Sequence, residues 1–149
     1  MEKVQFSVQI NAPVHLVWTT MLEDASYREW TSAFQEGSYF DGSWTMHGVL
    51  RFLAPDDTGA PSGLIGRVVE KRTDEFVSVE YIGQVVDGVD DTESERARSL
   101  AGMRENYSFS EENGVTTVTV DQDTSGEMAA MLEDAWPKSL AALKELAED

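Results

Sequence analysis

The 149-residue sequence contains no cysteine, which excludes disulfide bonds, thiolate catalysis and cysteine-ligated metal sites. It also lacks any apolar run long enough to cross a membrane. The first residues have neither the basic region nor the apolar core of a signal peptide. The sequence therefore predicts a cytoplasmic protein without membrane insertion.

Basic residues are scarce in this chain. It has 11 Lys and Arg against 28 Asp and Glu, which gives a formal net charge of −17. Such a surface repels phosphate backbones and anionic lipid headgroups, so we do not expect a nucleic-acid partner. The length fits a single domain over residues 1–149, and the hydrophobic share of 41% is ordinary for a globular protein.

Sequence motifs for catalysis and metal binding are also missing. There is no Gly-rich phosphate loop, nucleophile elbow or metalloprotease motif. By spacing, His15 and His47 fall on the more polar faces of their elements, without a second ligand. Glu70 and Glu80 are candidates for paired acid–base chemistry, but strand alternation points Glu80 outward. We therefore predict no catalytic residue, no metal and no cofactor, and we favour a binding protein over an enzyme.

The longest pattern in the sequence is a helical stripe from about residue 127 to residue 148. Thr124 and Glu127 have the spacing of a capping box, which predicts the start of a helix, and Pro137 predicts a kink within it. A stripe this wide has to lie on a large apolar surface. Its members, spaced by three and four residues, are Met128, Met131, Leu132, Ala135, Trp136, Ser139, Leu140, Leu143, Leu146 and Ala147.

The rest of the chain supplies strands for that surface. Residues 3–10 alternate between apolar and polar side chains, and Pro13 then opens a helix that a short helix with Tyr27 and Trp30 follows. Period-two patterns return in the segments 44–53, 64–72, 76–86, 106–109 and 115–120. Residues 87–102 indicate an exposed acidic loop. The order predicts an α+β fold, in which a curved antiparallel sheet of six to seven strands wraps around the long C-terminal helix, with two short helices after the first strand.

A likeness to a known family rests on segments that follow one another in a particular order. They are Val8–Trp18, Trp30, Gly42–Trp44, Phe52 with Pro55–Asp56, Tyr107–Phe109 and Trp136–Leu140. Together they resemble the START-like superfamily of helix-grip proteins, also called SRPBCC. Within it the chain is most similar to the single-domain bacterial branch related to the C-terminal domain of the Hsp90 ATPase activator, the AHSA1-like group. The resemblance implies a hydrophobic cavity between the concave sheet and the final helix.

Bulky apolar and aromatic residues are the candidates for lining that cavity. Any single one of them can simply pack the core, and we assign Trp18 and Phe6 to the core. As a set on a helix that faces a bent sheet, the others predict a pocket, with the hydroxyl groups of Tyr81 and Tyr107 as polar contacts. The predicted ligand-binding residues are Trp30, Phe34, Trp44, Phe52, Tyr81, Tyr107, Met128, Met131, Leu132 and Trp136.

Three functions are compatible with the sequence, ranked in the order given. The first is binding of a hydrophobic or amphipathic small molecule, lipid-like or polyketide-like, in the cavity. The second, implied by the resemblance, is a protein–protein interaction module like the Hsp90 activator, with a chaperone or another protein as partner. The third is an enzyme resembling the polyketide cyclases and aromatases of the same superfamily, which shape a reactive chain with a few polar groups.

Overall fold

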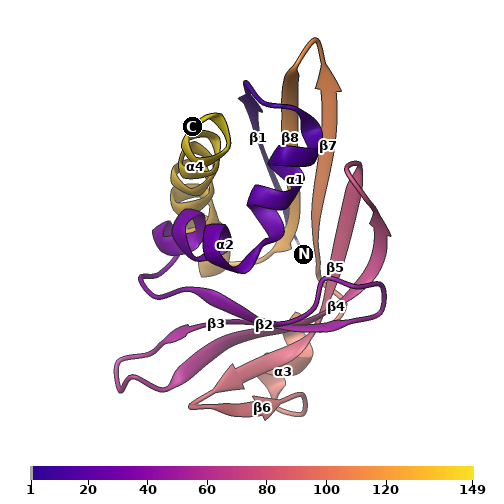
Figure 1. Cartoon of the computed structure of the whole chain (residues 1–149). Coiled ribbons are helices and arrows are strands. Elements are labelled where there is room, and N and C mark those ends of the chain that lie inside the picture. The colour runs from indigo at the N-terminus through magenta and orange to yellow at the C-terminus, as the bar shows by residue number, and fades with distance from the viewer. Residues whose placement is uncertain (1) are drawn as a thin grey trace.

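The computed structural model describes residues 2–149 and shows one curved antiparallel sheet, with α1, α2 and α4 gathered on one side of it (Figure 1). The eight-stranded sheet has the order β1-β8-β7-β5-β4-β3-β2, and β6 pairs with β5. The strands are β1 (Glu2–Ile10), β2 (Tyr39–Gly42), β3 (Val49–Pro55), β4 (Pro61–Arg72), β5 (Phe76–Val86), β6 (Val89–Asp91), β7 (Arg104–Glu112) and β8 (Val115–Thr124). The helices are α1 (Val14–Leu22), α2 (Asp24–Trp30), the 3-10 helix η1 (Thr31–Ala33), α3 (Glu95–Leu100) and α4 (Glu127–Glu148).

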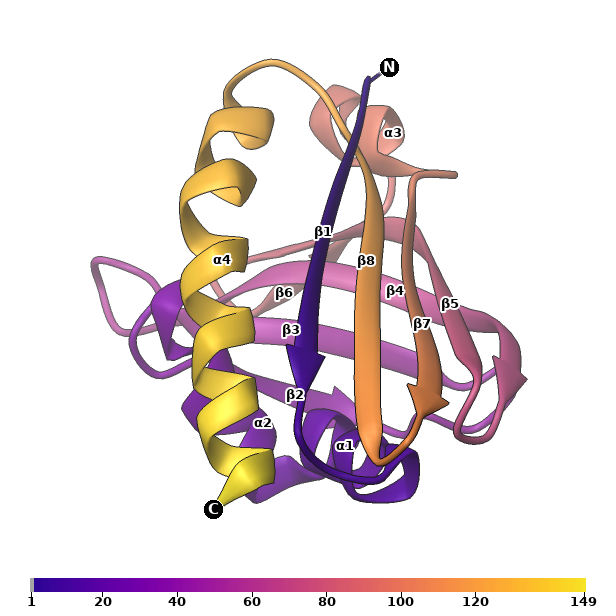
Figure 2. The same ribbon diagram turned by 90° about the horizontal axis from the view of Figure 1, so that it is seen from above.

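The sheet bends strongly between its two edges. Figure 2 shows β3 and β4 crossing behind β1 and β8. β4 carries register shifts at Ile65/Gly66 and Val68/Glu70, and irregularities of this kind increase the bend and twist of a strand. A Cβ atom on Gly66 would lie 2.4 Å from Cγ1 of Val79, so the close approach of β4 and β5 requires glycine. The bend makes one face of the sheet concave.

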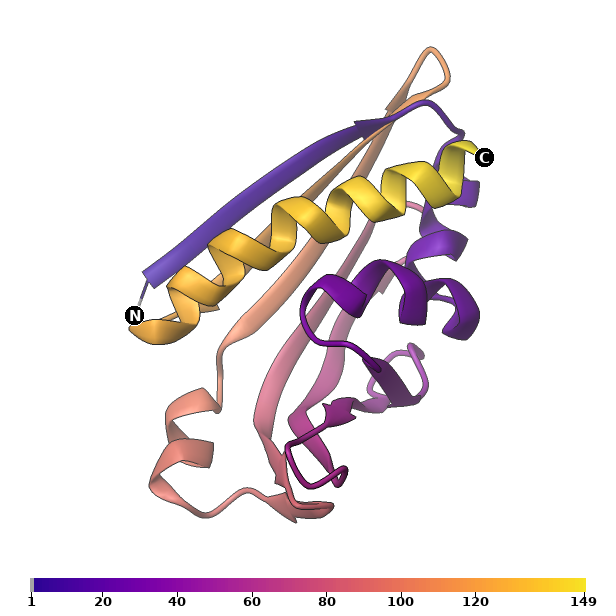
Figure 3. The ribbon, with the colours of Figure 1, turned by 90° about the vertical axis from the view of Figure 1, so that its left-hand side faces the viewer.

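Helix α4 lies beside β1 along the concave side, where α1, α2 and η1 also contact it (Figures 2 and 3). Pro137 is inside α4, and no sharp kink is visible along this helix in Figure 3, contrary to the prediction. The Pro137 side chain is exposed, so water can reach the carbonyl group of Glu133 that proline leaves without a donor. The buried residues of α4 are all members of the predicted stripe: Leu132, Ala135, Trp136, Ser139, Leu140, Leu143 and Ala147. The predicted α+β helix-grip arrangement is confirmed.

Helix α4 begins at Glu127 and ends at Glu148, as predicted, but its N-terminal cap differs from the prediction. Thr124 is the last residue of β8, where it pairs with Glu2 of β1 and is fully buried. Gly126 instead makes the turn into α4, at a φ of 55° that favours glycine. The capping-box prediction was wrong because the sheet ladder holds Thr124 in an extended conformation.

Two other segments also differ from their predictions. Residues 87–102 contain β6 and α3, and Ser94 caps α3 by accepting a hydrogen bond from the backbone N–H of Ala97 (3.1 Å). Residues 44–48 do not belong to a strand, and β3 begins at Val49. The short strands β2 and β6 bring the sheet to eight strands, where six to seven were expected. Both were missed because each has at most four residues, too few for a period to be visible.

The core assignments made from the sequence agree with the packing. Trp18 of α1 is buried, with its ring edge-on to Phe109 of β7 at 5.0 Å between ring centroids. Phe6 of β1 is partly buried and packs against the same cluster of buried residues. Within residues 2–149, no helix is both long and apolar enough to span a bilayer.

Candidate functional site

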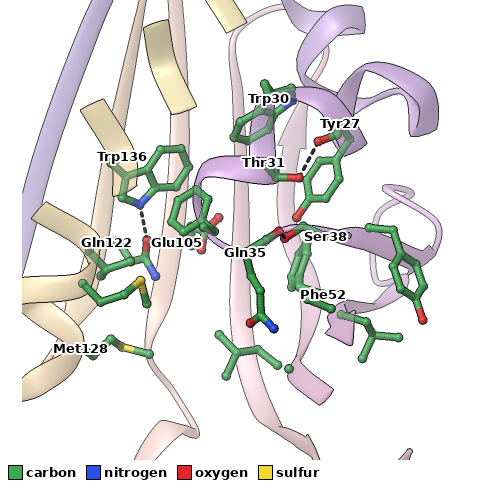
Figure 4. Close-up of a pocket in the computed structure, with 18 of the residues that line it drawn as sticks. Tyr27, Trp30, Thr31, Gln35, Ser38, Phe52, Glu105, Gln122, Met128 and Trp136 are labelled. Atoms are coloured by element: carbon green, nitrogen blue, oxygen red, sulfur yellow. Dashed lines mark hydrogen bonds between the residues drawn. The ribbon is translucent and has the colours of Figure 1, made fainter. Parts of the chain in front are cut away.

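A cavity of about 290 Å³ lies between the concave face of the sheet and the N-terminal half of α4. Figure 4 shows Trp136 and Gln122 on one side of it, Trp30 and Tyr27 on the other, and Glu105 between them. The wall comes from α2, η1, the segment after η1, β2, β3, β4, β5, β7, β8 and α4. The cavity is therefore assembled from segments far apart in the sequence, and the bend of the sheet brings them together.

All of the predicted residues except Trp44 line this cavity. Those brought together are Trp30, Phe34, Phe52, Tyr81, Tyr107, Met128, Met131, Leu132 and Trp136. Trp44 is buried outside the lining, with its ring centroid 5.8 Å from that of Phe52 and 6.2 Å from that of Tyr107. It supports two lining residues instead of facing the cavity, because the chain turns at residues 44–48 before β3 begins.

Trp136 is at the centre of an aromatic wall. Its ring stacks on that of Trp30 at 5.9 Å between centroids, and Phe34 meets it edge-on at 4.9 Å. Both indole N–H groups have acceptors, since Trp30 donates to the carbonyl of Met21 (3.1 Å) and Trp136 donates to Oε1 of Gln122 (2.8 Å). Buried indoles anchored at their N–H groups have little freedom to rotate, so this part of the wall is rigid.

The side of the cavity nearest the start of α4 is built differently. Met128 is partly buried and Met131 is 44% exposed, so α4 presents two unbranched side chains at the edge of the cavity. Thioether side chains adapt to irregular shapes more readily than branched or aromatic ones. Gln35 on the opposite side donates a hydrogen bond to the carbonyl of Pro55, which holds the segment after η1 to the end of β3. This edge can adjust to a molecule that the rigid wall cannot accommodate by itself.

A polar group, which we call the Glu105 cluster, lies in the same cavity, and all of its members are buried except Glu105, which is partly buried. The cluster consists of Glu105, Tyr81, Tyr107, Gln122 and Trp136. The hydroxyl of Tyr81 donates to Oε1 of Glu105, and the hydroxyl of Tyr107 donates to Oε2. Nε2 of Gln122 donates to the hydroxyl oxygen of Tyr81 at 3.0 Å. The carboxylate is thus held from two strands, β5 and β7, and supported from β8.

The ionisation of this cluster follows from its burial. Loss of water raises the pKa of the Glu105 carboxyl, although the hydrogen bonds from Tyr107 and Tyr81 offset part of the rise. Burial also raises the pKa of both tyrosine hydroxyls well above the usual value, and the negative charge of Glu105 adds to that effect. Tyr81 and Tyr107 therefore stay protonated and act as donors.

Sequence reasoning missed Glu105 and Gln122, although strand alternation contained a signal for both. Glu105 is two residues from Tyr107, on one face of β7, but the predicted strand began only at residue 106. Gln122 continues the buried face of Val118 and Val120 in β8, beyond the predicted end of that strand. The predicted strands ended short of both positions, so the two polar residues that complete the cluster with Tyr81 and Tyr107 were overlooked.

The two carboxylates that the sequence offered for acid–base chemistry, Glu70 and Glu80, lie outside the cavity. Glu80 is 3.9 Å from Arg104 in an ion pair outside the cavity, and Glu70 pairs with Arg72. His15 bonds to Asp74 on the surface. Across residues 2–149 no three His, Asp or Glu side chains gather closely enough to hold a metal ion. Glu105 is the one carboxylate among the described residues that line the cavity.

Comparisons with known proteins bear on the fold. No protein-family model matches the sequence, and the search of curated proteins found no match. Among solved structures, protein CV1439 from Chromobacterium violaceum is similar, with a TM-score of 0.70, 16% identity, and coverage of 100% of this chain and 99% of that one. Aha1 from Colwellia psychrerythraea, solved as a dimer, has a TM-score of 0.70 and 14% identity over 99% of this chain and 97% of that one.

A third similar structure is DynU16, described as a protein of the dynemicin biosynthetic locus. It has a TM-score of 0.68 and 16% identity, over 99% of this chain and 48% of that one. At such identities the likeness concerns the fold and not the activity. The chain thus shares its helix-grip fold with an Aha1 protein and with a protein of a biosynthetic locus.

Proposed function

We propose that this protein binds a small amphipathic molecule in the cavity between the sheet and α4. The observation that carries the proposal is the cavity itself, which combines a volume of about 290 Å³ and an aromatic wall with a single hydrogen-bonded carboxylate. Ligand sites are typically apolar cavities of roughly 300–1,000 Å³ with a few placed polar groups. The volume is at the lower end of this range and favours a compact, ring-containing molecule over a long-chain lipid.

The surface supports the partner-binding alternative less well than the cavity supports ligand binding. The exposed large hydrophobic residues are spread over α1, the turn at 44–48, the β5–β6 hairpin and α4: Leu16, Met46, Val86, Val89 and Met131. A docking surface would gather such residues into one patch. The likeness to Aha1 keeps a protein partner as an alternative.

An enzyme of the cyclase type is the second candidate function, and Glu105 is the observation that favours it. A carboxylate with a raised pKa in an apolar cavity can accept a proton from a bound molecule. The hydroxyl groups of Tyr81 and Tyr107 donate hydrogen bonds to the same carboxylate and hold it in place. Binding is common to both functions, so it is the property to test first.

The test is native mass spectrometry of protein purified from the organism that encodes it, followed by denaturing analysis of what is released. We expect one small molecule per chain in the wild type. The variant Met131→Trp adds bulk at the edge of the cavity, so it should carry no small molecule and release none on denaturation. Ala130→Trp is the matched control, because the neighbouring Ala130 is exposed on α4 and does not line the cavity. Bare wild-type protein that also shows no thermal shift with a panel of polyketide-like and lipid-like compounds would contradict the proposal.

A further inference from the structure

The charge of this cavity comes from a carboxyl group, so it is negative when that group is ionised. Among the described residues that line it there is no Lys, Arg or His, and Glu105 is the one acidic residue. Two basic residues near the cavity form ion pairs with other carboxylates. Arg104, the next residue along β7, pairs with Glu80, while Arg28 pairs with Asp24 at 3.2 Å and lies over the ring of Tyr39. The Glu105 carboxylate therefore accepts hydrogen bonds, but no basic side chain of the described residues forms an ion pair with it.

Trp136 determines the direction of the hydrogen bonds that run through Gln122 and Tyr81 to Glu105. An indole N–H can only donate, so the Gln122 atom that it meets has to be the amide oxygen. The Gln122 amide nitrogen must then donate to Tyr81, and the Tyr81 proton is left to point at Glu105. Glu105 is thus the terminal acceptor of the chain. A carboxylate has about four acceptor positions, and the two tyrosines use two of them.

Aromatic rings surround the space beside this carboxylate. Trp30, Phe34, Phe52 and Trp136 line the cavity with the Glu105 cluster, and they come from α2, the turn after η1, β3 and α4. The faces of aromatic rings attract cations, most strongly where water is excluded. A carboxylate without a cation, next to several aromatic rings, is a combination that stabilises an organic ammonium group.

We propose that the ligand of this cavity is an organic cation, a compact aromatic amine whose ammonium group donates to Glu105 while its ring lies among Trp30, Phe34 and Trp136. This proposal rests on the proposed function, that the cavity is a ligand site. The same geometry disfavours fatty acids and other carboxylates, because a second negative charge would face Glu105 with no basic residue to offset it. The net charge of −17 attracts cations from solution as well.

The experiment uses three probes of one shape and three charges: 2-naphthylmethylamine, 2-naphthylmethanol and 2-naphthoic acid. Each is titrated into the wild-type protein at neutral pH by isothermal calorimetry. We expect the amine to bind at least about tenfold more tightly than the alcohol, since its hydrogen bond to Glu105 is charge-assisted. The acid should bind most weakly.

Glu105→Gln removes the charge but keeps a side chain of the same size. This variant should lose the preference for the amine while it still binds the alcohol. Glu70→Gln is the matched control, because it removes one carboxylate from a strand of the same sheet but outside the cavity. Its preference for the amine should equal that of the wild type.

The outcomes separate the two proposals. If the acid binds as tightly as the amine, the cation assignment is overturned and the cavity remains a ligand site. If Glu105→Gln keeps the full preference for the amine, the assignment to Glu105 is overturned. If none of the three probes binds, both proposals fail. The order of the three affinities in the wild type needs no variant, so a Glu105→Gln protein that does not fold leaves the proposal testable.

Discussion

The two halves of α4 carry the same apolar stripe but do different things. In the C-terminal half, Leu140 and Leu143 are buried in a filled core, and Lys144 and Glu148 bond to the backbone of Gln9 and Asn11 at the end of β1. In the N-terminal half, Met131 and its neighbours border the cavity. The tie to β1 holds one end of the helix against the sheet, while the bend of the sheet opens a space under the other end. An apolar stripe therefore indicates which face is covered, but not whether the space beneath is filled.

The largest expected effect compares these halves directly. Leu143→Ala leaves a void in a filled core and should lower the free energy of unfolding by about 2–5 kcal/mol. Met131→Ala shortens a side chain that is 44% exposed and should change it by less than about 0.5 kcal/mol. Urea denaturation of both variants measures the difference. Equal losses would mean that the two halves of α4 are packed alike.

A smaller effect is expected at the link between the aromatic wall and the Glu105 cluster. Trp136→Phe removes the N–H donor to Gln122, and an unpaired buried amide oxygen costs about 1–3 kcal/mol. The double variant Trp136→Phe with Gln122→Leu removes both partners, so its loss should be smaller than the sum of the single losses. Urea denaturation of the wild type, the two single variants and the double variant completes a double-mutant cycle. Strictly additive losses would show that the hydrogen bond does not couple the two residues.

The smallest expected effect is the change in stability with pH that the ionisation of Glu105 causes. Its pKa in the folded protein is above the unfolded value, so the wild type loses stability as the pH rises through that window. Glutamine does not titrate, and the destabilisation caused by Glu105→Gln should therefore shrink as the pH rises above the ordinary glutamate pKa of about 4.3. The tyrosines that interact with Glu105 are Tyr81 on β5, Tyr107 on β7 and Tyr27 on α2. Arg104 precedes Glu105 on β7, where it pairs with Glu80, and the charge of Asp123 on β8 acts on Tyr81.

Thermal unfolding of both proteins across this pH range measures the effect on stability. Glu70→Gln controls for the loss of a charge outside the cavity. A difference between wild type and Glu105→Gln that stays constant with pH would contradict the raised pKa. The same ionisation predicts that binding of the amine probe weakens as the pH falls, because a protonated Glu105 has no charge to offer.

Sequence patterns predicted the fold well and the cavity wall in large part. The lining residues from Trp30 to Trp136 were named because bulky side chains at helical spacing had to meet the apolar face of a sheet. Trp44 was predicted to line the cavity because the period-two pattern over residues 44–53 predicted a strand, whereas residues 44–48 form a turn. Glu105 and Gln122 were missed because each is a polar residue near the end of a strand, where the alternation was cut short.

What the sequence by itself determined is the set of faces: which side of each strand and which stripe of α4 are apolar. Periodicity encodes that information locally, and it is sufficient for an α+β sheet covered by a C-terminal helix. Only the tertiary structure decided the distance between those faces and the meeting of Glu105 with Tyr81, Tyr107 and Gln122. That meeting depends on the register of β5, β7 and β8 and on the bend in β4, both of which result from contacts between residues far apart in the chain.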